Sequence, residues 1–246
     1  ATVAVYSTAD KEALHTLLAD EAICIGPAKS TDSYLNMNAV LSAAVLTEAE
    51  AIHPGFGFLS ENSKFATMCE EVGVKFIGPS GAIMDMMGDK INARAQMIKA
   101  NVPVIPGSDG EVFTAEEALE VAEKIGYPVM LKASAGGGGK GIRKVEKAED
   151  LVAAFESASS EAKAAFGNGA MYMERVIYPA RHIEVQILAD QYGHVVHLGE
   201  RDCSLQRNNQ KVLEEAPSVA IGKTLRQKIG YAAVRAAQSV GYENAG

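Results

Sequence analysis

The chain has 246 residues, with 23 Lys and Arg against 31 Asp and Glu, so its formal charge is −8. Apolar residues make up 48 % and charged residues 22 %, a globular composition that excludes disordered, collagen-like and coiled-coil chains. The acidic balance argues against a nucleic-acid or membrane-surface binder, because both need clustered Lys and Arg. No apolar run approaches the ~20 residues that span a bilayer.

The first third of the chain alternates strands and helices, which predicts a parallel sheet covered by helices. Apolar spacing predicts strands over 2–6, 22–25, 51–53 and 74–77, and helices over 9–19, 34–46 and 60–72. Ser60 is the expected N-cap of the third helix, and Gly73 follows its end. The first strand begins at the first residue and the last residues follow a helix, so we expect a fragment of a longer chain.

The later elements change in character. Helices are expected over a segment that carries Met86, Lys90, Arg94 and Ile98, then over 115–125, 148–166 and 223–240. A linker with Pro and Gly is expected over 104–109. Strands are expected over 128–134, 142–145 and 171–176, followed by a hairpin of 182–189 and 194–201. These elements predict a second body after the linker.

Cys24, Cys69 and Cys203 are odd in number, far apart and lack a CxxC spacing. We expect all three to be small buried side chains, as in a cytoplasmic protein. The histidines show no metal-ligand spacing either, so the sequence predicts no metal site.

A glycine-rich loop, Gly136 to Gly141 with one Lys, lies between two expected strands. Consecutive glycines let backbone N–H groups approach a polyphosphate closely. Neither a dinucleotide fingerprint nor a P-loop fits, because both must lead into a helix. A strand–loop–strand flap over ATP phosphates fits, as in kinases. Lys132 enters the loop among apolar neighbours and needs an anionic partner; a flexible surface loop is the alternative.

The segment from His182 to Ile187 alternates strictly, so His182, Glu184 and Gln186 share one face of a strand. This face is either solvated or part of a ligand cleft. The polar run from Glu200 to Lys211 is either an exposed loop or an anion pocket made by Arg and Lys.

Together, these motifs resemble biotin carboxylase, the ATP-grasp component of biotin-dependent carboxylases, and most closely the subunit of bacterial acetyl-CoA carboxylase. The resemblance covers essentially the whole chain. The motifs that carry it are His53 to Asn62, Met87 to Lys90, Lys132 with its glycine loop, Arg181 to Glu184, Glu200 to Lys211, and Glu214 to Pro217.

The resemblance implies an α/β fold, with a Rossmann-like N-terminal domain followed by a partial ATP-grasp domain with a glycine-loop lid. Residues 1–77 would be most of the first domain, without its first strand and helix. Residues 78–104 would be connecting helices, 105–176 the lid, and 177–246 the start of the C-terminal ATP-grasp domain.

The implied reaction is the activation of bicarbonate by ATP to carboxyphosphate, followed by carboxylation of biotin on its carrier protein. In acetyl-CoA carboxylase this is the first half-reaction and serves fatty acid synthesis. The resemblance assigns bicarbonate to Lys211 with Gln206 nearby. It assigns ATP to a larger group: Lys90, Lys132, Gly138, Gly139, Glu174, Arg175, Val176, Ile177, His182 and Asn209.

Two residues depart from the family pattern. Asn209 stands where a His is frequent, and Phe56 where a Tyr is common. The family's Mg²⁺ ligands, bicarbonate arginine and general base are expected beyond Gly246, so the chain alone is expected to be inactive. A homodimer is implied for the longer protein. Three alternatives remain: a non-catalytic nucleotide-binding fragment, the biotin carboxylase part of another biotin-dependent carboxylase, and another ATP-grasp ligase such as a carbamoyl-phosphate synthetase half.

Overall fold

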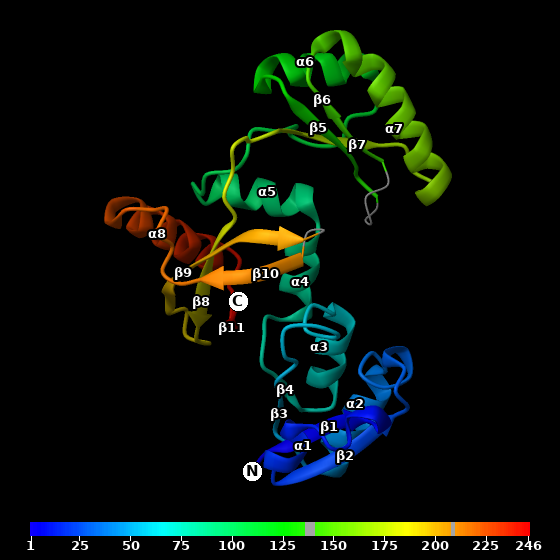
Figure 1. The fold of residues 1–246 in the computed structure, drawn as a ribbon, viewed down its shortest axis with the longest axis vertical. Coiled ribbons are helices and arrows are strands. Elements are labelled where there is room, and N and C mark those ends of the chain that lie inside the picture. Colours follow the sequence, from blue (N-terminus) through cyan, green and yellow to red (C-terminus); the bar gives the residue numbers. More distant parts are fainter. Residues whose placement is uncertain (136–140, 208–209) are drawn as a thin grey trace. The chain divides into compact units, whose positions relative to one another are not determined.

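The computed structural model describes residues 1–135, 141–207 and 210–246, which form two compact units (Figure 1). The first unit comprises Ala1–Asp89, Glu184–Arg201 and Glu215–Gly246. The second comprises Lys90–Ile183 and Asp202–Glu214. The mixed α/β class predicted from the sequence is confirmed.

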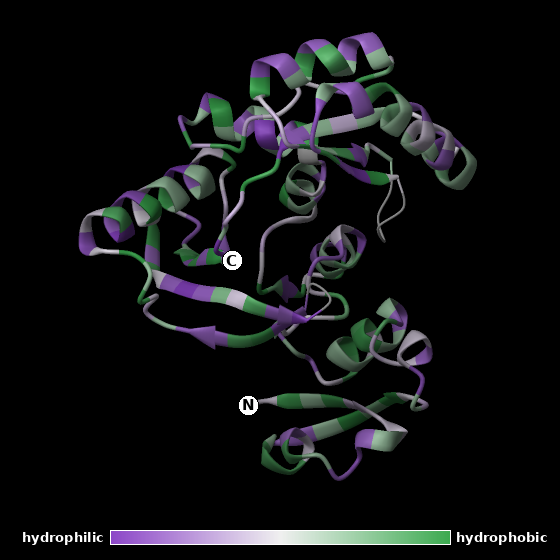
Figure 2. Cartoon of the chain, turned by 45° about the horizontal axis from the view of Figure 1, so that its top comes forward, coloured by the Kyte–Doolittle hydropathy of each residue, from purple (hydrophilic) through white to green (hydrophobic). Residues whose placement is uncertain are grey.

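The N-terminal part of the first unit contains two separate pairs of parallel strands. β1 (Val3–Ser7) pairs with β2 (Glu21–Gly26), and β3 (Ala51–Ile52) pairs with β4 (Lys75–Phe76). Most of the residues of β1 and β2 are apolar (Figure 2). Four helices accompany these strands: α1 (Leu14–Leu18), α2 (Met37–Leu46), α3 (Ser63–Glu71) and α4 (Gly81–Gly88).

Two helices begin at residues other than those predicted. The N-cap of α3 is Asn62, whose side chain accepts from Phe65 N at 2.9 Å, so the predicted cap at Ser60 is wrong. Both residue types can cap, and the turn before α3 selects the later one. The predicted helix through Lys90 is divided at Asp89, whose ψ of 108° is extended. It forms α4 and α5 (Lys90–Lys99).

The core of these elements is built by Phe65, Cys69 and Phe76, which are at most 3 % exposed. The rings of Phe65 and Phe76 meet edge to face with centroids 6.1 Å apart. Cys69 and Cys203 are buried, as expected, but Cys24 is exposed. The expectation fails there because Cys24 lies on an outer position of β2, which only one neighbouring strand covers among the residues described.

The second unit contains a three-stranded antiparallel sheet in the order β6-β5-β7. Its strands are β5 (Val129–Ala133), β6 (Ile142–Val145) and β7 (Met171–Arg175), and its helices are α6 (Ala115–Ile125) and α7 (Leu151–Phe166). A capping box between Thr114 and Glu117 begins α6, as the S/T-x-x-E pattern favours. Both helices cover the same face of the sheet (Figure 1) and close a core on it.

The segment expected as a linker continues this sheet instead. Ser108 N donates to Met173 O at 2.8 Å, and Val112 N donates to Met171 O at 2.7 Å. Gly107 forms an isolated bridge with Glu174. The outer edge of β7 therefore finds partners for its backbone groups, which buried strands require.

The remaining strands form a sheet in the order β10-β9-β8-β11. They are β8 (Ile183–Ala189), β9 (Val195–Arg207), β10 (Gln210–Glu215) and β11 (Asn244–Ala245), and α8 (Lys223–Ser239) precedes the last. The prediction ended β9 at Arg201 and missed β10. All residues of β10 are exposed, so its sequence lacks the apolar alternation that marks a strand.

Within the described part of the chain, the helices are too short or too polar to cross a membrane.

Candidate functional site

One face of the three-stranded sheet is left uncovered by α6 and α7, and it carries charged side chains. Along β5, Val129, Leu131 and Ala133 are buried in the core, so Lys132 points to the opposite face. Lys132 lies opposite Tyr172 of β7 in the register, and Glu174 is two residues further along that strand. Strand alternation places all three of these polar side chains on one face.

Lys132 and Glu174 form an ion pair through Nζ and Oε1. Their side chains are 28 % and 22 % exposed, so each charge is partly removed from water. A lysine in this position needs an anion, and Glu174 supplies one. The sequence predicted both residues as ATP contacts but did not predict that they pair with each other.

Arg94 and Tyr172 lie beside this pair and were missed by the sequence analysis. Arg94 Nη1 donates to Ile105 O, while its Nε is buried without a hydrogen-bond partner among the described residues. Burial raises the pKa of Tyr172, and the charge of Arg94 partly opposes that rise. Arg94 lies one helical turn after Lys90 on α5, a spacing that could have indicated it.

The end of β7 is held by backbone hydrogen bonds. Arg175 N donates to Pro106 O and Val176 N donates to Pro128 O, both at 2.8 Å. The side chain of Arg175 is exposed, and Ile177 is 49 % exposed. In the predicted adenine-binding segment, hydrogen bonds therefore fix the backbone of Arg175 and Val176. The apolar side chain of Ile177 is accessible to a ligand.

His182 and Gln206 are connected through one short stretch of β9. His182 N donates to Ser204 Oγ at 3.0 Å, and its carbonyl accepts from Cys203 N at 2.8 Å. Gln206 Nε2 donates to Cys203 O at 2.9 Å. The side chains of His182 and Gln206 are exposed on these strands.

Lys211 lies on β10, with its Nζ 3.8 Å from Glu214 Oε1 and its side chain 40 % exposed. Earlier in the same polar run, the buried carboxylate of Asp202 accepts from Arg181 Nη1 at 3.2 Å. The described residues of the polar run, 200–207 and 210–211, lie on β9 and β10, and Glu200, Arg201, Asp202 and Lys211 each have an oppositely charged partner.

The described candidate residues all belong to the second unit. Gly138, Gly139, Asn209 and the side chain of Lys90 lie outside the described residues.

The polar face predicted for β8 is confirmed in the first unit by Glu184 and Gln186. Arg201 Nε donates to Glu184 Oε1 at 2.6 Å, and Arg201 Nη1 donates to Gln186 Oε1 at 3.0 Å. A guanidinium held by two acceptors is oriented in one direction. Arg201 therefore orders the two side chains of the neighbouring strand.

Two family models match the chain. Residues 1–84 match "Biotin carboxylase, N-terminal domain", and residues 89–246 match "Carbamoyl-phosphate synthase L chain, ATP binding domain". The chain is 56 % identical over 246 residues to a biotin carboxylase of Nostoc sp., of which it covers 55 %. It is 51 % identical over 244 residues to a pyruvate carboxylase subunit of Methanothermobacter thermautotrophicus, of which it covers 50 %. The chain spans about half the length of the curated relatives it matches.

Solved structures agree with these matches. A biotin carboxylase–β,γ-ATP complex from Campylobacter jejuni has a TM-score of 0.85 and 53 % identity, over 99 % of this chain and 55 % of that one. The biotin carboxylase domain dimer of 2-oxoglutarate carboxylase from Hydrogenobacter thermophilus was solved with MgADP, ADP and bicarbonate. It has a TM-score of 0.82 and 49 % identity, over 99 % of this chain and 54 % of that one.

Proposed function

The chain belongs to the biotin carboxylase family, and from that membership we propose that it supplies nucleotide-binding and bicarbonate-binding residues of a biotin carboxylase. The reaction is the ATP-dependent carboxylation of biotin on a biotin carboxyl carrier protein, with bicarbonate as the carbon source and carboxyphosphate as the intermediate. Solved relatives with a nucleotide and bicarbonate support this proposal.

The observation that carries the proposal is the charged face of the second unit. Lys132 is a partly buried cation on β5, the strand that leads toward the glycine-rich loop, and Arg94 adds a second cation beside the same sheet. Two buried polar atoms, Arg94 Nε and Ser134 Oγ, have no hydrogen-bond partner in the described part of the chain. A phosphate group fits such a set, because it brings several acceptors and a negative charge.

In this proposal Lys132 exchanges Glu174 for a phosphate of ATP when nucleotide binds. Lys90, Gly138 and Gly139 contribute further phosphate contacts. Glu174, Arg175, Val176 and Ile177 line the adenine segment, and His182 and Asn209 approach the rest of the nucleotide. The backbone hydrogen bonds of Arg175 and Val176 favour this role, since a fixed segment loses little entropy on binding.

Lys211 and Gln206 are the proposed bicarbonate residues. Bicarbonate is a small anion with few groups to contact, so a fixed ammonium supplies much of its attraction. Glu214 lies 3.8 Å from Lys211 Nζ, a long ion-pair distance at which another anion can replace the carboxylate.

Mg²⁺ accompanies ATP in this reaction and neutralises phosphate charge during transfer. The carboxylates of the second unit that the structure describes near the candidate residues are already paired: Glu174 with Lys132, Asp202 with Arg181, and Glu214 with Lys211. We propose no Mg²⁺ ligand among these three carboxylates, because none of them stands at a position to which the family resemblance assigns a metal ligand.

The acceptor that finally receives the carboxyl group is proposed to be acetyl-CoA, with a role in fatty acid synthesis. Relatives that are 52 to 56 % identical carry the plain name biotin carboxylase. Pyruvate carboxylase and 2-oxoglutarate carboxylase are the competing assignments, because relatives of both kinds match as well. We further propose a cytoplasmic homodimer, in line with the dimeric relative.

Nucleotide binding is tested on the chain itself by equilibrium dialysis with radiolabelled ATP. Lys132→Ala is expected to weaken binding about tenfold to a hundredfold, the loss of one charge-assisted contact. Lys124→Ala, at an exposed position of α6, is the matched control and leaves binding unchanged. Equal binding by the parent and Lys132→Ala would show that Lys132 does not contact the nucleotide.

The carboxylation step is tested in a chimera. In it, residues 1–246 of this chain replace the matching part of the Nostoc biotin carboxylase. In that chimera, Lys211→Ala is expected to raise the KM for bicarbonate by roughly one to two decades and to leave the KM for ATP nearly unchanged. The control is Lys223→Ala at the exposed start of α8. If Lys211→Ala raised the KM for ATP and left the KM for bicarbonate unchanged, the roles assigned to Lys132 and Lys211 would be wrong.

A further inference from the structure

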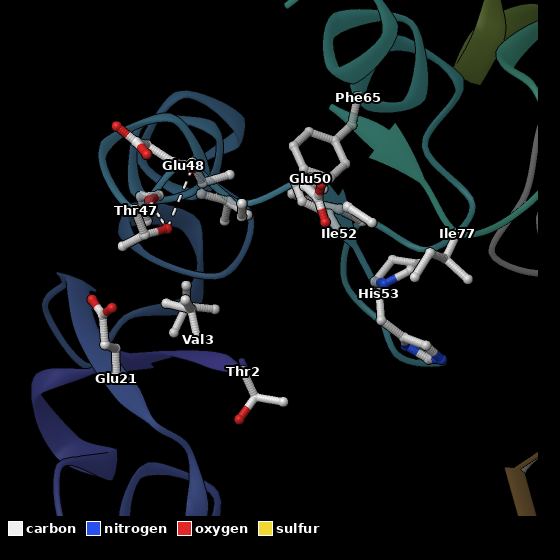
Figure 3. Close-up of a pocket in the computed structure, with 18 of the residues that line it drawn as sticks. Thr2, Val3, Glu21, Thr47, Glu48, Glu50, Ile52, His53, Phe65 and Ile77 are labelled. Atoms are coloured by element: carbon white, nitrogen blue, oxygen red, sulfur yellow. Dashed lines mark hydrogen bonds between the residues drawn. The ribbon is translucent and has the colours of Figure 1, made fainter. Parts of the chain in front are cut away.

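A slot of about 670 Å³ in the first unit is lined by residues of β1 and β3 (Figure 3). Apolar side chains such as Val3, Ile52 and Phe65 form its walls, as core residues of one sheet do. The family resemblance places the first strand of this domain before Ala1, and a strand between the two parallel pairs would fill the slot. We therefore assign no ligand to it.

The turn that joins α7 to β7, in the second unit, contains an Asn-Gly sequence at Asn168 and Gly169. Gly167 ends α7 in the left-handed region with a φ of 76°, and its N–H donates to Lys163 O at 2.9 Å. Asn168 is exposed, whereas Ala170 is only 2 % exposed. The turn thus holds an asparagine at the surface, directly before residues that enter the core.

The side chain of Asn168 is folded over the peptide bond that follows it. Asn168 Oδ1 accepts from Ala170 N at 2.9 Å. The ring that this hydrogen bond closes includes Asn168 Cγ and the nitrogen of Gly169, so the two atoms are confined to one small turn. The same N–H points at the oxygen on which negative charge develops when a nucleophile adds to Cγ, as the donors of an oxyanion hole do.

The nitrogen of Gly169 is the nucleophile nearest to that carbon along the chain. Among the residues that the structure describes, none accepts a hydrogen bond from its N–H. Glycine also carries no side chain that would hinder its attack. Ser159 Oγ donates to Gly169 O at 2.7 Å, and a Cβ added to Gly169 would lie 2.8 Å from the same oxygen. Ser159 therefore fixes Gly169 from the side of α7 and leaves its nitrogen able to react.

We propose that Asn168 is a site of spontaneous modification, at which the fold promotes deamidation through a cyclic imide. Gly169 N gives up its proton to water and forms a bond to Asn168 Cγ. The bond from Cγ to the side-chain nitrogen breaks, and ammonia leaves. Water then opens the ring at either carbonyl and yields aspartate or isoaspartate. The reaction consumes one water molecule, releases one ammonia molecule and requires no oxidant, reductant or enzyme.

The modification changes the backbone beside the strand end that leads to the glycine-rich loop. Ala170 O accepts from Ser134 N at 3.0 Å, and Ser134 directly follows β5. Isoaspartate adds one carbon to the main chain two residues before Ala170 and places a carboxylate there. We expect this change to displace Ala170 and to weaken its hydrogen bond to Ser134. Deamidation thus loosens the end of β5 slowly and in one direction.

The test is incubation of the purified 246-residue protein at a mildly alkaline pH, followed by peptide mass spectrometry. Deamidation is read from the mass gained when the amide becomes an acid, and isoaspartate from methylation by isoaspartate methyltransferase. The reference is the free peptide Phe-Gly-Asn-Gly-Ala-Met, which has the same sequence without the fold. We expect Asn168 in the protein to react at least about tenfold faster than the peptide, because the Ala170 N–H is already in place.

Internal and variant controls isolate the part played by the turn. Asn36 and Asn62, whose side chains cap α2 and α3, are expected to remain unmodified. Ser159→Ala removes the hydroxyl that fixes Gly169, and it is expected to lower the rate about threefold to tenfold toward that of the peptide. Ser160→Ala, at the exposed neighbouring position of α7, is the matched control and leaves the rate unchanged.

The consequence for Ser134 is measured by NMR amide exchange on fresh and incubated protein. We expect the amide of Ser134 to exchange at least about tenfold faster after incubation. The amide of Gly126, which donates to Ala122 O on α6, is the internal reference and stays unchanged. Asn168→Gln forms the cyclic imide far less readily, so incubation of this variant is expected to leave Ser134 unchanged.

The proposal is overturned if Asn168 in the folded protein reacts no faster than the free peptide, or if Ser159→Ala and Ser160→Ala react at the same rate. It is also overturned if Ser134 exchanges equally fast in fresh and incubated protein. The comparison of the unaltered protein with the peptide retains its force if a variant fails to fold.

Discussion

Lys132 and Glu174 form an ion pair that costs desolvation and leaves each side chain about a quarter exposed. A pair of this kind contributes little net stability, but removing one partner leaves the other charge uncompensated. The pair holds the lysine in place on the open face of the sheet, and in the proposed function a phosphate of ATP replaces the carboxylate there.

This interpretation separates stability from binding. Lys132→Met is expected to destabilise the second unit by about 1 kcal/mol, because Glu174 loses its partner. The double variant Lys132→Met, Glu174→Gln is expected to recover most of that loss and still bind ATP poorly. Urea unfolding and equilibrium dialysis measure the two effects. A double variant as unstable as the single one would show that the ion pair itself stabilises the fold.

The cysteines differ in a way that thiol chemistry reports. Burial raises the pKa of Cys69 to about 11, whereas Cys24 is exposed. At pH 8 the thiolate fraction of a group with that pKa is about two orders of magnitude below that of an ordinary cysteine. We expect Ellman's reagent to modify Cys24 quickly and Cys69 only after unfolding. Cys24→Ser removes the fast phase; its persistence in that variant would contradict the assignment.

At the scale of elements, β9 and α8 are joined by a buried carboxylate. Glu200 Oε1 accepts from Arg226 Nε at 2.6 Å and from Ser218 N at 3.2 Å, and Glu200 is 5 % exposed. Arg226 also donates to the carbonyls of Ser218 and Ile221, at 2.9 and 3.3 Å. The Glu200–Arg226 pair thus provides hydrogen-bond partners for three backbone groups in the connection between β10 and α8, namely the N–H and carbonyl of Ser218 and the carbonyl of Ile221.

The pH dependence of stability follows from this pair. The hydrogen bond from Arg226 holds the pKa of Glu200 below its ordinary value of 4.5. The unfolded state therefore binds the proton first, and the stabilisation is present above that value and lost as the pH falls below it toward the folded-state pKa.

Glu200→Gln is expected to lower the free energy of unfolding at pH 7 and to reduce its change between pH 6 and 3. Removing the charge leaves Arg226 without its ionic partner, a loss of about 3 kcal/mol or more for a buried pair. Denaturant titrations at several pH values measure this. Glu156→Gln on the exposed side of α7 is the control. Parallel pH profiles for parent and Glu200→Gln would contradict the role given to the carboxylate.

At the scale of the whole molecule, the described candidate residues fall in one of the two compact units. A ligand stabilises the part of a protein that binds it, by about 2.7 kcal/mol at a hundred times its dissociation constant. Saturating ATP is therefore expected to slow amide exchange in β5 and β7 and to leave α3 unchanged. Hydrogen-exchange mass spectrometry measures both. Equal protection of the two units would contradict the location of the site.

The predicted bounds were right where the residues of an element and its immediate neighbours mark both of its ends. The helix Ala115–Ile125 and the strand Ile142–Val145 agree with the predicted bounds, because helical apolar spacing marks the first and the glycine-rich loop sets the start of the second. The predicted cap at Ser60 and the single helix through Lys90 were wrong. Both errors occur where several residues have similar propensities and the surrounding backbone selects one of them.

The amino-acid sequence by itself determined the α/β class, the order of most elements and the family, because apolar period and motif residues are local properties of the chain. The tertiary structure alone decided which residues meet. It paired Lys132 with Glu174 across 42 positions of sequence and brought Arg94 beside Tyr172. It also placed the expected linker along the outer edge of β7, where Gly107 bridges Glu174. Such contacts depend on strand register and on how backbone groups find partners far along the chain, and no local pattern carries that information.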